Sequence, residues 1–163
     1  MRKVSDYVLE RRLDPGGHHE VWLARRGDGR AVAVKLGGSP QPADGENELI
    51  PGLVPVLESG LSDGVAYQVM PLVPGITLSD RLAEGPLLAN EAERVVASVT
   101  HTVVALHAAG RTHGDIRSAN VVLGRDGEVT LIDREQRDWA APHSDRAALA
   151  LLLLGSGRAS PSA

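Results

Sequence analysis

The chain has 163 residues, 42% of them hydrophobic, so it can bury a core of the size expected for one domain. Aromatic residues make up only 2% and cysteine is absent, which predicts an aliphatic core and excludes disulfides. The net charge of −4, with both signs mixed, provides no basic surface for nucleic acid or an anionic membrane. Neither a signal peptide nor a membrane span is evident, so we expect a cytoplasmic protein.

The first 73 residues have the pattern of short β-strands separated by turns. The predicted strands are 7–13, 20–25, 30–36, 53–59 and 65–71. Arg26-Gly27-Asp28-Gly29 and Ser62-Asp63-Gly64 are the predicted hairpin turns. Between the third and fourth strands, residues 39–50 leave room only for a short helix, because Pro40 and Pro42 interrupt its start. This part of the sequence therefore predicts a β-rich unit.

The remainder of the chain is predicted to be mainly helical. Thr77 to Leu82 is a short helix with Thr77 as N-cap. The strongest helix runs from Asn90 to Ala109, with Asn90 and Glu93 resembling a capping box and Gly110 at C′. Its apolar stripe consists of Ala92, Val95, Val96, Val99, Val103 and Leu106. A second helix, Ser144 to Leu154, is apolar almost all round, which predicts burial, and a polar, disordered tail follows it.

A polar loop and a short hairpin lie between the two long helices. Val121-Val122-Leu123 and Glu128–Ile132 are its predicted strands, joined by a turn at residues 124–127. An antiparallel hairpin brings its outer ends together, so Asn120 and Asp133 should lie side by side, with Asp115 on the loop just before them. Two carboxylates and an amide oxygen would suit Mg²⁺ and a bound phosphate. The alternative is an ordinary polar loop, since Asp and Asn are common in turns.

The residues around this hairpin resemble motifs of the protein-kinase superfamily. His113-Gly114-Asp115-Ile116-Arg117-Ser118-Ala119-Asn120 is similar to the catalytic loop H-R-D-L-x-x-x-N, and Leu131-Ile132-Asp133 resembles the approach to D-F-G. The resemblance implies that Asp115 accepts the proton of the substrate hydroxyl and that Asn120 and Asp133 hold Mg²⁺. Arg117 would neutralise the transferred phosphoryl group. Asp145 resembles the residue that binds the backbone of the catalytic loop from a buried helix.

The upstream motifs follow in the order that this family has. Ala31–Leu36 resembles the V-A-I-K strand, which implies that Lys35 binds the α- and β-phosphates of ATP. Residues 13–24 resemble the Gly-rich loop, with Gly16 and Gly17 at the phosphates, and residues 67–75 resemble the hinge. The positions that the resemblance assigns to adenine are Val21, Ala33, Met70 as gatekeeper, Pro71, Val73 and Val122.

The resemblance covers residues 8 to 155 and implies an α+β, two-lobed protein-kinase-like fold. A β-rich N-lobe would occupy residues 1–73, a reduced helical C-lobe 74–155 and the tail 156–163. The implied cofactors are ATP and Mg²⁺, the implied activity is serine/threonine-type protein phosphotransfer, and the protein substrate or partner is unknown. The small size also resembles, more weakly, the RIO-type and tRNA-modification-complex kinases.

Several residues depart from the family pattern. Asp14 and His19 replace two glycines of the Gly-rich loop, Gly114 replaces the arginine of H-R-D, and Arg134 and Glu135 replace the Phe and Gly of D-F-G. A charged Arg134 is not expected to fill an apolar slot.

The helix that pairs with Lys35 is also short, and Glu46 or Glu48 could reach this lysine only if that helix is shifted. These differences support an alternative, a pseudokinase or scaffold module with weak or no catalysis. A truncated product with an exposed apolar face on the 145–154 helix is a third possibility.

Overall fold

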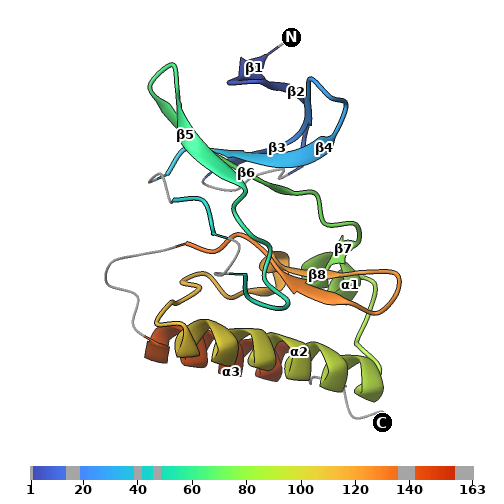
Figure 1. Ribbon diagram of the computed structural model, residues 1–163. Coiled ribbons are helices and arrows are strands. Elements are labelled where there is room, and N and C mark those ends of the chain that lie inside the picture. The colour runs from blue at the N-terminus through green and yellow to red at the C-terminus, as the bar shows by residue number, and fades with distance from the viewer. Residues whose placement is uncertain (1, 14–18, 39–41, 46–48, 136–141, 157–163) are drawn as a thin grey trace. The chain divides into compact units, whose positions relative to one another are not determined.

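The computed structural model describes residues 2–13, 19–38, 42–45, 49–135 and 142–156 (Figure 1). These residues form an α+β fold with two compact units. The first unit comprises residues 1–49 and 55–72, and the second comprises 50–54 and 73–163. Among the described helices, none combines the length and hydropathy needed to cross a bilayer.

The first unit is a six-stranded antiparallel sheet in the order β1-β2-β3-β4-β6-β5. Its strands are β1 Lys3–Val4, β2 Tyr7–Arg12, β3 Glu20–Arg26, β4 Ala31–Leu36, β5 Glu58–Ser62 and β6 Val65–Pro71. Alternate residues of β4, namely Val32, Val34 and Leu36, belong to a buried aliphatic core. Period-2 alternation therefore leaves Ala33 and Lys35 on the other face of the sheet.

The strand predicted at 53–59 is wrong, because β5 begins only at Glu58. Asp63 and Gly64 both have positive φ, at 51° and 78°. This is typical of the two-residue turns that match the twist of a hairpin, and it pairs Ser62 with Val65. Leu53 instead forms a β-bridge with Leu131 of the second unit's hairpin. Pro55 also disfavours a strand here, because it has no backbone N–H to donate to a neighbouring strand.

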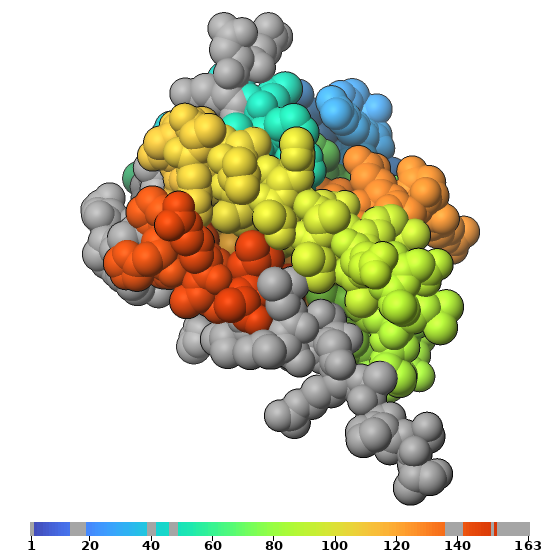
Figure 2. Space-filling model, turned by 90° about the horizontal axis from the view of Figure 1, so that it is seen from below, coloured from blue at the N-terminus to red at the C-terminus, as the bar shows by residue number. Residues whose placement is uncertain are grey.

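The second unit contains a three-stranded sheet, β7-β8-β9, packed on helices. Its elements are β7 Ile76–Thr77, α1 Leu78–Ala83, α2 Ala89–Ala108, a 3₁₀ turn Ser118–Asn120, β8 Val121–Leu123, β9 Val129–Leu131 and α3 Pro142–Ser156. Leu106, Val121 and Leu131 are almost fully buried at the centre of its core. Helices α2 and α3 lie next to each other, as Figure 2 shows, and Ala148, Leu149 and Leu152 of α3 pack against this core.

The ends of the helices follow local chemistry, with one exception. Thr77 is the N-cap of α1, as predicted, and its hydroxyl accepts the N–H of Asp80 at 3.0 Å. Gly110, with φ of 70°, ends α2 as predicted, and Arg111 donates back to the Leu106 carbonyl. The predicted Asn90 capping box is wrong, because α2 begins at Ala89 and the extended Leu88 is its N-cap.

The second long helix is confirmed as α3, but its predicted burial on all sides is not. Ala147 and Ala150 are exposed, which costs little because an alanine side chain carries one methyl group. Most of the predicted tail, residues 157–163, lies outside the described residues.

Candidate active site

Four of the predicted nucleotide-binding residues share one face of the first unit's sheet. Val21 of β3 lies opposite Lys35 of β4, and Ala33 of β4 lies opposite Met70 of β6. Directly opposed residues point to the same side of an antiparallel pair, as do residues two apart on one strand. The register therefore gathers these four side chains on the face opposite the aliphatic core. Pro71 is the last residue of β6 and lies opposite Val32. For this residue, the sequence predicts a contact with adenine through the backbone carbonyl only.

Lys35 is 5% exposed and lies opposite Gln68, which is also buried. The two acidic residues considered as its partners, Glu46 and Glu48, lie outside the described residues, as do Gly16, Gly17 and Asp14 of the Gly-rich loop. His19, the bulky residue at the third glycine position of that loop, is described. Its ring lies over Gly37 and Gly38, where a β-carbon at Gly38 would be 3.2 Å from the ring.

The catalytic-loop residues form a hydrogen-bonded cluster in the second unit. The Asn120 side-chain amide donates to Oδ2 of Asp115 at 2.7 Å and to the Asp115 carbonyl at 2.9 Å. Arg117 Nε also donates to Asp115 Oδ2, at 2.9 Å. Asn120 is 4% exposed, whereas the side chains of Asp115 and Arg117 are 26% and 56% exposed. A buried amide thus holds a carboxylate that faces solvent.

The hairpin forms as predicted and carries the second proposed metal ligand. Val121 pairs with Leu131, and Ile132 N–H donates to the Asn120 carbonyl at 2.8 Å. The ladder therefore places Ile132 opposite Asn120, and Asp133 follows immediately. Asp133 has φ of 60°, a left-handed conformation that side chains rarely adopt and that is concentrated at functional sites. Val122, assigned to adenine, is buried between Thr77 and Thr130, and Val73 is half-buried just before β7.

His113 is a buried connector whose protonation state is set by its partners. Its ring Nε2 lies 3.0 Å from the Ile132 carbonyl, and its Nδ1 accepts the Asp115 N–H at 3.2 Å. A carbonyl cannot donate, so Nε2 carries the proton and the ring is neutral. Burial lowers the pKa of His113 to about 4, which agrees with this tautomer.

Asp145 on α3 ties the catalytic loop to both long helices. Its carboxylate accepts the backbone N–H of His113 at 2.8 Å and of Gly114 at 2.9 Å, which confirms the predicted contact with the loop. His107 of α2 contributes Nε2 at 3.0 Å. Burial alone would raise the pKa of Asp145, but the hydrogen bonds from His107, His113 and Gly114 lower it below its usual value.

The departure from H-R-D at Gly114 has a steric cause. Gly114 has φ of 82°, and a β-carbon there would fall on the carbonyl oxygen of Glu135, closer than side-chain contacts allow. Glu135 N–H in turn donates to the His113 carbonyl at 2.8 Å. The segment after Asp133 therefore crosses directly over Gly114, and only glycine fits at position 114.

The charged side chain of Arg134 is buried in the structure. It occupies the place of the Phe in D-F-G, yet it is only 7% exposed. Long arginine side chains can bury their methylene groups while the guanidinium makes polar contacts. Residues 136–141, the rest of the short activation segment, lie outside the described residues.

Several known proteins with similar sequences are bacterial serine/threonine-protein kinases. The "Probable serine/threonine-protein kinase PkwA" of Thermomonospora curvata is 28% identical over 139 residues, which cover 77% of this chain and 19% of that protein. PknD of Chlamydia trachomatis is 33% identical over 157 residues, which cover 80% of this chain and 17% of that protein. The chain matches no protein-family model.

The fold agrees with these sequence matches. The kinase domain of Mycobacterium tuberculosis PknI, crystallised as a double mutant, superposes with a TM-score of 0.82 over 95% of this chain and 76% of that domain, at 22% identity. The chain belongs to the protein kinase superfamily. It is a serine/threonine-protein-kinase-like domain that spans less than a fifth of the length of the curated relatives named above.

Two functional features of this kinase-like domain were missed by sequence reasoning. The first is the pair of roles played by His113, which supports Asp115 with one ring nitrogen and the hairpin with the other. The second is His107, whose contact with Asp145 spans two helices. His107 follows the buried Leu106 in the last turn of α2. This position beside the apolar stripe is the one sequence signal that could have indicated a contact between His107 and another helix.

Proposed function

We propose that this kinase-like domain binds ATP with Mg²⁺ and transfers the γ-phosphoryl group to a serine or threonine hydroxyl of a protein. The observation that carries the proposal is the Asp115–Asn120 hydrogen bond at the end of the hairpin that continues into Asp133. An acid–base carboxylate beside a metal-binding amide is the arrangement that phosphoryl transfer needs, because the chemistry depends on positioning and charge stabilisation.

The donor set of the second unit fits Mg²⁺. Asn120 donates its amide N–H groups to Asp115, which leaves Oδ1 for a metal, and Asp133 supplies carboxylate oxygens. In the part of the chain that the structure describes, no cluster of three or more His, Cys, Asp or Glu side chains could hold a metal by itself. Mg²⁺ at Asn120 and Asp133 would therefore take further oxygens from the ATP phosphates and water, as Mg²⁺ commonly does.

Asp115 is arranged to receive the acceptor hydroxyl. Arg117 and Asn120 both donate to Oδ2, and Oδ1 has no hydrogen-bond partner among the described residues. Oδ1 would accept the hydroxyl proton as the oxygen attacks the γ-phosphorus in line with the leaving group. The terminal nitrogens of Arg117, which has a half-exposed side chain, would offset charge on the transferred group.

The remaining roles follow from the family motifs. Lys35 is assigned to the α- and β-phosphates, and Gly16 and Gly17 to phosphate contacts through their backbone. Adenine contacts are assigned to Val21, Ala33, Met70 and Pro71 in the first unit, and to Val73 and Val122 in the second. The common sheet face of Val21, Ala33, Lys35 and Met70 supports these assignments.

Substitution of Asp115 separates catalysis from nucleotide binding. Asp115→Asn should leave the thermal shift caused by MgATP intact and reduce phosphotransfer by roughly 10²-fold or more, as expected for a positioned acid–base group. Asp126→Asn is the matched control, because Asp126 lies in the turn at the opposite end of the same hairpin and its Oδ1 caps the Glu128 N–H. Equal transfer by wild type and Asp115→Asn, with a generic protein acceptor and in autophosphorylation, would contradict the enzymatic proposal.

The metal assignment has its own test. ATP should raise the melting temperature only with Mg²⁺ present, and Asp133→Ala should abolish this dependence. An ATP shift of the same size in EDTA would refute the assignment of Asn120 and Asp133 to Mg²⁺.

A pseudokinase or scaffold module is the second candidate. The buried Arg134 favours it, since a charged residue replaces the apolar one that follows the metal aspartate in the family motif. An MgATP-dependent thermal shift without transfer above that of Asp115→Asn would identify such a module.

A further inference from the structure

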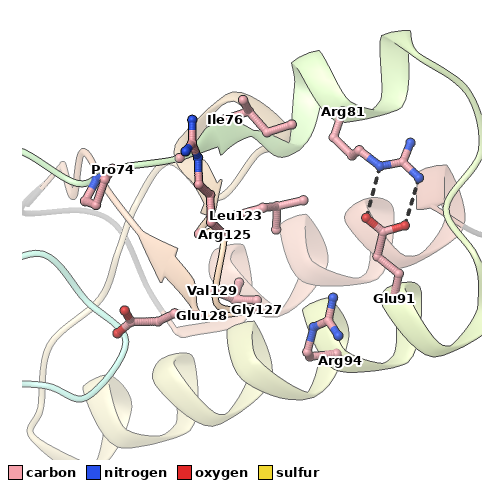
Figure 3. A pocket seen from close by; sticks show the side chains of 12 residues that line it. Pro74, Ile76, Arg81, Glu91, Arg94, Leu123, Arg125, Gly127, Glu128 and Val129 are labelled. Carbon is pink, nitrogen blue, oxygen red and sulfur yellow. Dashed lines mark hydrogen bonds and ion pairs between the residues drawn. The ribbon is translucent and has the colours of Figure 1, made fainter.

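A cavity of about 550 Å³ opens on the second unit, at the turn end of the β8–β9 hairpin (Figure 3). Its lining comes from the segment before α1, from α1 itself, from the first turns of α2 and from the hairpin turn. The lining includes Arg81, Glu91, Arg94, Arg125, Ile76 and Leu123. The cavity contains none of the residues assigned to ATP, Mg²⁺ or catalysis. Its volume lies in the range typical of ligand sites.

Three arginines contribute to this cavity, and only one of them is neutralised. Arg81 of α1 forms two parallel hydrogen bonds to the Glu91 carboxylate, at 3.0 and 2.8 Å. Arg94 and Arg125 make no hydrogen bond or ion pair with any residue that the structure describes. With Glu128 as the other acidic lining residue, the lining carries a net positive charge in a chain whose total charge is −4. A ligand with negative charge is therefore complementary to the cavity.

Arg94 lies close to the backbone of the hairpin turn. Gly127 has φ of 87°, and a β-carbon there would lie 3.8 Å from the Arg94 guanidinium. The guanidinium thus lies over the bare backbone of the hairpin turn, while Arg125 extends from that same turn (Figure 3). Gly75 is more tightly constrained, since a β-carbon there would overlap the Leu123 carbonyl oxygen. At Gly75 a side chain is excluded by the neighbouring strand, whereas at Gly127 it is disfavoured only by the left-handed φ.

The cavity also has an apolar component that a simple anion would not use. Pro74, Ile76, Leu123 and Val129 line it, and Ile76 remains 45% exposed. Inorganic phosphate has no apolar atoms to cover these side chains, and Glu128 disfavours a compact dianion. Carboxylate side chains next to an apolar residue match both components, because guanidinium groups pair well with carboxylates.

We propose that this cavity is a docking site for a short acidic peptide segment of a partner protein, with glutamate or aspartate carboxylates at Arg94 and Arg125 and an apolar side chain at Ile76 and Leu123. The site is independent of nucleotide binding and phosphotransfer. The bound protein would be a substrate or a regulator, and its contacts would not involve Asp115. The peptide would bind whether or not the domain is catalytically active.

Fluorescence anisotropy of the full chain with labelled peptides tests the proposal. The probe is a fluorescein-labelled hexapeptide of alternating glutamate and leucine, and the matched peptide carries glutamine in place of glutamate. The glutamate peptide should bind saturably, weaken with added salt, and bind at least about tenfold more tightly than the glutamine peptide. Absence of saturable binding, or equal binding of the two peptides, would overturn the proposal.

Substitutions then locate the binding site. Arg94→Gln and Arg125→Gln should each raise Kd roughly three- to fivefold, as expected for exposed ion pairs, and the double variant roughly tenfold or more. Arg146→Gln is the matched control, since Arg146 is an exposed arginine of the same unit outside the cavity. Unchanged melting temperatures show that the variants fold. Unchanged peptide affinity in the double variant, or competition by inorganic phosphate at the same concentration as the unlabelled peptide, would refute peptide docking.

Discussion

Acidification provides a quantitative test of the buried His113. Because the ring is neutral in the folded state and its pKa is lowered from 6.5 to about 4, the unfolded chain takes up the proton first. The stability that this histidine contributes is fully present above pH 6.5 and is lost as the pH falls toward 4. One pKa unit corresponds to about 1.4 kcal/mol, so acidification from pH 7 to 4.5 should reduce the unfolding free energy by about 2 to 3 kcal/mol through this group.

The described helices all lie in the second unit, so urea unfolding followed by circular dichroism at 222 nm reports on the unit that contains His113. His113→Gln should flatten the stability profile between pH 6.5 and 4.5, although it lowers stability at pH 7. His101→Gln is the control, because His101 lies exposed on α2 and should leave the profile unchanged. An imidazole NMR titration that gives His113 a pKa near 6.5, or equal pH slopes for wild type and His113→Gln, would refute the reasoning.

Urea unfolding of further variants tests three other local features. Gly114→Ala should cost about 2 kcal/mol or more, because it adds a clash with Glu135 to an unfavourable φ, whereas Gly110→Ala, with open space around it, should cost only about 1 kcal/mol. Thr77→Ala should cost about 1 kcal/mol through loss of the α1 cap. Burial and the hydrogen bond to Glu58 raise the pKa of Tyr7 to about 12. Stability should therefore fall as pH rises from 10 toward 12, and Tyr7→Phe should remove that fall.

The features predicted correctly from sequence are those that depend on short-range chemistry. The hairpin after Asn120 forms because its apolar strands and Asp-Gly turn act over a few residues. The Thr77 cap and the Gly110 terminus have equally local causes. Order along the chain and the family motifs indicated the superfamily, although each motif alone is weak.

Apart from the Asn90 capping box, where α2 simply begins one residue earlier, the features that sequence reasoning missed depend on partners far away in sequence. Leu53 pairs with Leu131 rather than continuing a strand, and Thr102 of α2 donates to the Pro51 carbonyl of that same segment. The departure from H-R-D at Gly114 is explained only by the contact with Glu135, because a β-carbon at Gly114 would overlap the Glu135 carbonyl oxygen. The burial of Arg134 is likewise not encoded by any local pattern.

The three contacts of Asp145 set an order of events during synthesis. The buried backbone N–H groups of His113 and Gly114 depend on a carboxylate that is translated about thirty residues later. Until Asp145 has left the ribosome and α3 has docked, these amides lack their partner, and unpaired buried amides are costly. The loop that carries Asp115 is therefore completed late, so that a nascent chain acquires the geometry proposed for phosphotransfer only after its third helix is in place.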